Sequence, residues 1–190
     1  MNPKPDLRIA NETGTDLSHH AREVESLWAA YSSNENPRVP LTFTCDEQVW
    51  LKVSGHIFRE FYANPEVHLH TQLEGKLWFC NNVIGDMLPG PPERWDVSIQ
   101  LWMEENEFFG CDVQYQEDDY AWAKPLPLDK EDLLLHLSEI DPEERVRQSS
   151  AFKMYNALKE LADEMTFAGR PVEIVPPGSS THGIFTKAAE

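Results

Sequence analysis

The stretch AFKMYNALKELADEMTFAGRPVEIV, residues 151–175, places a helix directly before a strand. Apolar side chains recur at three- and four-residue spacing as far as Met165, which predicts an amphipathic helix that stops at Gly169-Arg170-Pro171. The preceding Asp141-Pro142-Glu143-Glu144 has the cap residue, the proline and the acidic side chains of a helix start. Residues 172–175 (VEIV) then predict a short buried strand. A long helix that leads straight into a buried strand is typical of α/β proteins.

Two further strands and several helices extend this pattern toward the amino terminus. Residues 38–44 (RVPLTFT) and 96–101 (DVSIQL) are short and rich in apolar side chains, so each predicts a buried strand. Helices are predicted at residues 17–31, at 48–62 with an interruption at Ser54-Gly55, from 64 to about 79, and at 129–137. Strands that alternate with helices predict an α/β fold with a parallel sheet, which is compatible with a doubly wound sheet or a TIM-barrel-like (β/α)8 fold.

Three predicted strands are few for a closed barrel. A barrel of this kind takes roughly 250 residues, whereas the chain has 190. We therefore expect either an open sheet or only the amino-terminal part of a barrel. An open parallel sheet leaves an edge to be covered, so the chain is expected to be marginally stable alone or to form an oligomer.

The composition excludes several classes of function. The chain has 16 Lys+Arg against 33 Asp+Glu, a formal net charge of −17, and 41% hydrophobic residues. A hydrophobic fraction of this size argues against disorder, and the negative charge repels phosphate backbones and anionic lipids, so neither nucleic acid nor a membrane is an expected partner. The three cysteines are an odd number and far apart, and the amino terminus has no signal-peptide pattern, which favours a soluble protein of the cytoplasm.

One segment is strongly acidic. Residues 95–123 contain no Lys or Arg, and CDVQY and YAWAK, joined by QEDD, predict a β-hairpin at residues 111–124. The tip of this hairpin is expected to be acidic and exposed.

Candidate site residues follow the predicted strands, because chemistry in parallel α/β folds is placed at the carboxyl ends of the strands. Carboxylates gathered there repel one another, so one of them can serve as an acid, a base or an acceptor for amine or pyrrole N–H groups. The predicted catalytic residues are Asp46, Glu104 and Glu105. The predicted substrate-binding residues are Glu47, Trp102, Ser180, Thr181 and His182. No metal site is predicted, since His68 and His70 are two positions apart on a helix and point to different faces.

Several short phrases, in this order, resemble the amino-terminal half of the uroporphyrinogen decarboxylase superfamily. They are Arg38-Val-Pro-Leu-Thr-Phe43, Phe61-Tyr-Ala-Asn-Pro-Glu66, Trp102-Met-Glu-Glu105, Phe108-Phe-Gly-Cys111, Pro125-Leu-Pro-Leu128, Val175-Pro-Pro-Gly178 and His182-Gly-Ile-Phe-Thr186. The resemblance implies a partial barrel at residues 38–190, preceded by a helical arm at 1–37. It also implies a parent activity of either tetrapyrrole (porphyrinogen) decarboxylation or corrinoid-dependent methyl transfer.

The resemblance also bears on substrates and cofactors. The family's decarboxylases carry an Arg-Gln-Ala-Gly-Arg stretch after the first strand, whereas residues 45–52 here are CDEQVWLK. An acidic loop without arginines is a poor partner for a porphyrinogen with eight carboxylates, which disfavours uroporphyrinogen itself. The family's pyrrole-binding aspartate would lie near Glu104 or Glu105. Zinc and a corrinoid, or a corrinoid protein as partner, are implied by the resemblance alone, and no zinc ligand can be named in this chain.

A second hypothesis belongs to a different class. Under this hypothesis the chain is a non-catalytic binding module whose acidic hairpin at residues 111–124 docks on a basic surface of a protein partner or a corrinoid carrier. The two hypotheses assign importance to different carboxylates. An enzyme depends on Glu104 and Glu105, whereas a docking module depends on Glu117, Asp118 and Asp119.

Overall fold

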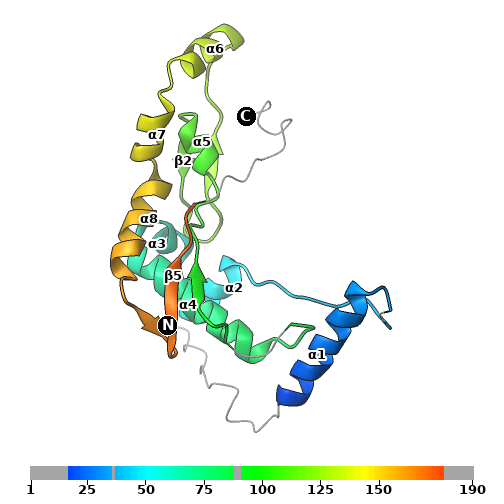
Figure 1. Ribbon diagram of the computed structural model, residues 1–190. Coiled ribbons are helices and arrows are strands. Elements are labelled where there is room, and N and C mark those ends of the chain that lie inside the picture. Colours follow the sequence, from blue (N-terminus) through cyan, green and yellow to red (C-terminus); the bar gives the residue numbers. More distant parts are fainter. Residues whose placement is uncertain (1–16, 36, 88–90, 178–190) are drawn as a thin grey trace. The chain divides into compact units, whose positions relative to one another are not determined.

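The computed structural model describes residues 17–35, 37–87 and 91–177 (Figure 1). The chain divides into two compact units. The first unit comprises Met1–Gly55 and His70–Arg94, and the second comprises His56–Leu69 and Trp95–Glu190. The fold is of mixed α and β type, with short strands confined to the second unit among the described residues.

The first unit is helical. It contains α1 (Leu17–Ser32), α2 (Glu47–Ser54) and the carboxyl-terminal part of α4 (Pro65–Asn82), because the division falls within α4. Helix α1, the end of α2 at Gly55 and the start of α4 at Pro65 all agree with the sequence predictions. Its buried apolar side chains are Val24, Leu27, Trp50, Leu51, Val53 and Leu73.

A glycine allows α2 and α4 to pack closely. A Cβ added at Gly75 would lie 2.2–2.6 Å from atoms of the Trp50 side chain, a separation that no carbon pair tolerates. The ammonium group of Lys76 lies 5.5 Å from the centroid of the same indole. Helix α4 therefore presents a bare backbone to Trp50, which is 6% exposed.

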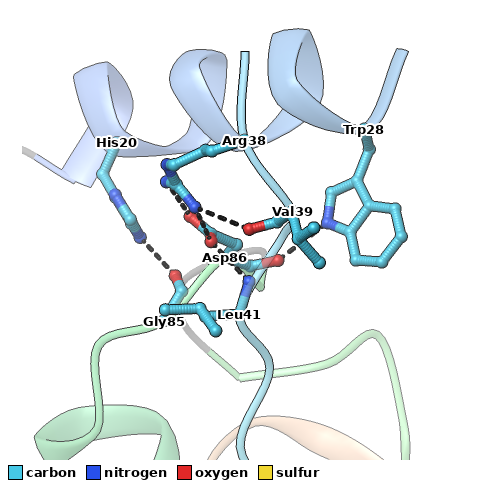
Figure 2. A network of polar contacts seen from close by, with 7 residues as sticks. All are labelled: His20, Trp28, Arg38, Val39, Leu41, Gly85 and Asp86. Carbon is cyan, nitrogen blue, oxygen red and sulfur yellow. Dashed lines mark hydrogen bonds and ion pairs between the residues drawn. The ribbon is translucent and has the colours of Figure 1, made fainter. Parts of the chain in front are cut away.

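The predicted strand at residues 38–44 is wrong. This segment has no regular secondary structure, and its apolar side chains Val39, Leu41 and Phe43 are 67%, 62% and 48% exposed. The physical reason lies at Asp86, whose carboxylate accepts the Leu41 N–H (2.7 Å) and whose own N–H donates to the Leu41 carbonyl (2.7 Å). Figure 2 shows that Arg38 reaches the same carboxylate. The backbone of Leu41 is thus bonded to a loop rather than to a neighbouring strand.

The sheet of the second unit has the order β1-β5-β4, with β1 (Trp95–Val97), β5 (Arg170–Ile174) and β4 (Thr166–Phe167). Strands β1 and β5 are parallel, with Trp95 opposite Val172, and lie side by side in Figure 1. Both were predicted, although β1 is shorter than the expected 96–101. The antiparallel strand β4 was not predicted.

The long helix predicted before β5 is divided. Helix α7 (Pro142–Gln148) ends before Ser149, and α8 (Ser150–Leu161) begins there, because the Ser149 hydroxyl accepts the N–H of Phe152 as an N-cap. The helix also ends earlier than predicted. Gly169, expected as its stop, has φ +74° and instead forms the turn between β4 and β5.

The acidic hairpin is confirmed. Strands β2 (Asp112–Gln114) and β3 (Trp122–Lys124) pair antiparallel. Three short helices complete the second unit: α3 (Phe58–Ala63), α5 (Glu104–Phe108) and α6 (Lys130–Ser138). The core is formed by Phe58, Phe61, Leu69, Trp95, Val97, Leu101, Met154 and Leu158. Among the described parts of the chain, no helix is both long and apolar enough to cross a membrane.

Candidate functional site

The site begins where β1 ends. Because β1 and β5 are parallel, their carboxyl ends lie at the same edge of the sheet. Residues 98–105 follow β1 at this edge. Val175 is the first residue after β5, and its N–H donates to the carbonyl of Val97, the last residue of β1 (2.8 Å). The predicted residues Ser180, Thr181 and His182 lie outside the described residues.

Trp102 has an unusual backbone. Its φ of +68° is in the left-handed region, which a bulky residue rarely adopts. The indole is 45% exposed and meets the ring of Tyr120 edge-on, with the centroids 5.9 Å apart. Strained backbone that persists in a folded protein is concentrated at functional sites, so this position supports the choice of Trp102 as a candidate.

Glu104 turns back toward the end of β1. Its Oε1 accepts the N–H of Leu101 at 3.2 Å, and the side chain is half-buried. Glu105 is also half-buried, in the first turn of α5. The structure therefore places both predicted catalytic carboxylates in the first turn of α5, the helix that follows β1, close in sequence to the strained Trp102.

A third carboxylate, Glu107, was not predicted. Both of its oxygens accept the N–H of Ser150 at 3.1 Å, and Oε1 also accepts the Ser150 hydroxyl at 2.7 Å. Ser150 opens α8, so this bond ties the helix to α5. The acidic run that contains Glu104 was a signal for Glu107, but nothing in the sequence connects it with Ser150.

Tyr115, on the hairpin, completes the group. Burial raises the pKa of its hydroxyl above 10.0, the negative charges of Glu107 and Glu104 raise it further, and a hydrogen bond with Ser150 acts in the opposite direction. Glu104, Glu107, Tyr115 and Ser150 are named here the carboxylate–tyrosine cluster. It offers carboxylate acceptors next to a phenol that stays protonated at neutral pH, a set that can accept N–H groups or exchange a proton.

Asp46 and Glu47 belong to the first unit, and the other predicted carboxylates belong to the second. Asp46 occupies the N-cap position of α2 without a side-chain capping bond. Glu47, the first residue of α2, is 1% exposed. A carboxylate so deeply buried lies within the packing of its unit, so we assign Glu47 no direct substrate contact.

The described residues hold no group of three or more His, Cys, Asp or Glu side chains that could bind a metal ion. His68 and His70 do point to different faces of α4, as expected: His68 is buried and His70 is exposed. The imidazole of His68 stacks on Phe61 and lies within hydrogen-bond distance of the carbonyl oxygens of Phe61 (3.0 Å) and Ser98 (3.1 Å). Its role is to fasten α4 to α3 and to the residue after β1.

Comparisons of the chain with known protein families, with curated proteins and with solved structures find no match.

Proposed function

We propose that this chain is a uroporphyrinogen decarboxylase-like protein that carries the amino-terminal part of a TIM-barrel-like fold. Its parent activity would be tetrapyrrole decarboxylation or corrinoid-dependent methyl transfer. The observation that supports the proposal best is the pair of parallel strands β1 and β5, with Glu104 and Glu105 in the first turn of α5, the helix that follows β1 along the chain. In parallel α/β folds this is the position of the reacting groups.

The carboxylates at the start of α5 suit a tetrapyrrole. A porphyrinogen presents pyrrole N–H groups, which are hydrogen-bond donors, and Glu104 and Glu105 supply acceptors. Trp102, exposed beside them, offers an aromatic face for the macrocycle. Uroporphyrinogen itself remains disfavoured, because neither residues 45–52 nor 95–123 contain an arginine to pair with its many carboxylates.

Corrinoid-dependent methyl transfer would need a zinc site and a corrinoid, which the described residues do not supply. The described residues contain no ligand set for zinc, so we assign zinc no role in this chain. A corrinoid would reach the site as a substrate or on a partner protein. The three cysteines are free thiols, which supports a reducing compartment such as the cytoplasm.

Tetrapyrrole binding can be measured directly. Coproporphyrin, which has fewer carboxylates than uroporphyrin, and hydroxocobalamin are titrated with the protein, and the shift of their visible absorption bands reports binding. We expect saturable binding of one of them, weakened about tenfold by Glu104→Gln or Glu105→Gln, the loss of one charge-assisted hydrogen bond. Glu160→Gln, an exposed change on α8, is the matched control. Absence of binding of either macrocycle would contradict the proposal.

A second candidate function, docking on a basic protein surface, is favoured by the exposed hairpin. Asp118, Asp119 and Trp122 are exposed, the last by 62%. Glu117 is already engaged, because its carboxylate pairs with Arg59 at 2.7 Å and its carbonyl accepts the N–H of Phe58 at 3.1 Å. The docking surface would therefore consist of Asp118, Asp119 and Trp122 rather than of all three tip carboxylates.

The two candidates are separated by two variants. The double variant Asp118→Asn, Asp119→Asn should lower the rate of association with a basic partner. This reduction should be smaller at high salt, where the charges are screened, and the affinity for the macrocycle should not change. Glu104→Gln should weaken macrocycle binding and leave the rate of association with the basic partner unchanged. The partner is identified by cross-linking through a photoreactive group at position 122. If the Asp118→Asn, Asp119→Asn variant captures the same proteins as the parent chain, docking through the tip is ruled out.

A further inference from the structure

A small cavity lies beside the carboxylate–tyrosine cluster, within the second unit. Its volume is about 250 Å³, and it is lined by Glu107, Phe108, Arg145, Gln148, Ser149 and Lys153. These residues come from α5, from α7 and from the start of α8, where the break at Ser149 separates the two helices. The cavity therefore lies at the division of the long helix predicted from the sequence.

Two cations line the cavity, and neither has a counter-ion among the described residues. Arg145 is half-buried, and neither it nor Lys153 forms an ion pair with any described residue. Arg147, only two positions from Arg145, does pair, with Glu143 at 3.0 Å. In a chain with twice as many acidic as basic side chains, this half-buried guanidinium has no carboxylate partner within the described part of the chain.

Among the described lining residues, the one carboxylate is already engaged in other contacts. Glu107 accepts the N–H and the hydroxyl of Ser150, three contacts in all. Gln148 donates its amide to Glu144. Two N–H groups in the first turn of α8 are also engaged, since Glu107 accepts that of Ser150 and the Ser149 hydroxyl accepts that of Phe152. The attraction for an anion comes from the two side-chain cations and not from the helix end.

The guanidinium group of Arg145 is kept near the turn after α5. Its Nη2 lies 3.8 Å from the position that a Cβ would take at Gly110, where the backbone has φ +93°. His136, whose Nε2 lies 3.2 Å from the same Cβ position, donates through Nε2 to the carbonyl of Phe109 at 2.9 Å. Gly110 thus leaves room for both basic side chains.

We propose that this cavity binds a small oxyanion, through a carboxylate or phosphate group that pairs with Arg145 and Lys153. The planar fork of an arginine suits two oxygens of either group, and a lysine adds a second positive charge. The volume limits the ligand to a small metabolite or to one acidic arm of a larger one. The site uses none of the residues assigned to macrocycle binding, so either proposal can fail without the other.

The test uses inorganic phosphate and malonate as probes, titrated at constant ionic strength and followed by amide chemical shifts of the whole chain. We expect saturable shifts at residues 107–110 and 145–153 with at least one probe. Arg145→Gln and Lys153→Gln should each weaken binding about tenfold or more. The probe with the higher affinity identifies the oxyanion as phosphate or carboxylate.

Matched controls are available on the same two helices. Arg147→Gln and Lys159→Gln remove the same charges at positions outside the cavity and should leave the affinity within about twofold. If these controls weaken binding as much as the cavity variants, the attraction is a general effect of charge, and the proposal is overturned. Shifts that do not saturate overturn it as well. Lys153 is exposed, so Lys153→Gln should not disturb folding. It therefore tests the proposal even if Arg145→Gln lowers the stability of the protein.

Discussion

Arg38 and Asp86, 48 positions apart in the sequence, form an ion pair that uses two guanidinium nitrogens and both carboxylate oxygens. The same carboxylate accepts the N–H of Leu41. Two other contacts reach this loop from α1: Trp28 donates through Nε1 to the Asp86 carbonyl (2.7 Å), and His20 lies 2.9 Å from the Gly85 carbonyl (Figure 2). Asp86 is therefore the point at which α1 and the segment after it are attached to the end of α4.

This attachment should weaken in acid. The hydrogen bond from Arg38, and next that from the Leu41 N–H, lower the pKa of Asp86 from 3.8 to about 2. A carboxyl with a lowered pKa in the folded state adds stability above its unfolded pKa, and this stability is lost as the pH falls from about 4 to about 2. The protection factor of the Leu41 amide, which is its intrinsic exchange rate divided by the measured rate, should fall toward the acid end of this range.

The variant Asp86→Asn provides the control for this prediction. It removes the charge and should leave the Leu41 amide weakly protected at every pH, so that its protection factor no longer depends on acid. Asp112→Asn, which removes a longer ion pair to Lys124 between exposed side chains, should leave the amide of Leu41 unaffected. An acid dependence that survives in Asp86→Asn would assign it to another group.

Gly75→Ala should destabilise the first unit. The added methyl group would lie 2.2 Å from the Trp50 ring, and the buried indole has little room to move. Overpacking of this kind costs about 1–3 kcal/mol, which outweighs the gain of about 1 kcal/mol expected for replacing glycine by alanine within a helix. Urea denaturation measures the difference in the free energy of unfolding between Gly75→Ala and the parent chain.

The double variant Gly75→Ala, Trp50→Leu tests the cause. The losses of stability from the two single changes should be less than additive, because the smaller side chain at position 50 removes the clash. Full additivity would show that the two positions do not interact.

Ser149→Ala should weaken the start of α8. The Ser149 hydroxyl accepts the Phe152 N–H at 3.1 Å, and the loss of such a cap costs about 1 kcal/mol. Ser26→Ala is the contrasting variant, because Ser26 lies inside α1, where its hydroxyl bonds back to the Arg22 carbonyl. Alanine is the better helix former there, so Ser26→Ala should be neutral or slightly stabilising. Thermal unfolding of the two variants should therefore shift in different directions, and equal shifts would remove the special role of Ser149.

The features that the sequence predicted correctly depend on neighbours along the chain. Asp129 was expected to cap a helix, and its carboxylate does accept the N–H groups of Glu131 and Asp132. The hairpin at residues 111–124 and the interruption at Gly55 are also local, since turn residues and a left-handed glycine produce them. Signals of this kind act within one helical turn or one hairpin. All the residues that produce them are therefore close together in the sequence and can be recognised from it.

The errors arise from contacts between distant positions. The apolar pattern of residues 38–44 is that of a strand, but Asp86, 45 positions beyond Leu41, takes both backbone hydrogen bonds of that residue. In the same way Glu104 and Glu105 were identified because they follow a strand, whereas the bond between Glu107 and Ser150 spans 43 positions. Periodicity cannot show which distant polar group a backbone or a carboxylate will find, and this is why the cavity beside Ser149 was not predicted either.

The carboxylate–tyrosine cluster can be followed through the titration of Tyr115. Burial first, and then the charge of Glu107, raise the pKa of this phenol above its ordinary 10.0. A raised pKa makes the folded state more stable below pH 10, and this contribution is lost as the pH rises through the folded value. Glu107→Gln removes the charge but not the burial, so the pKa of Tyr115 should move only part of the way toward 10. Ultraviolet difference titration measures this pKa, and subtraction of the Tyr115→Phe curve isolates it from the other tyrosines. An unchanged value in Glu107→Gln would mean that the carboxylate does not act on the phenol, and the two residues would then have to be treated as independent parts of the site.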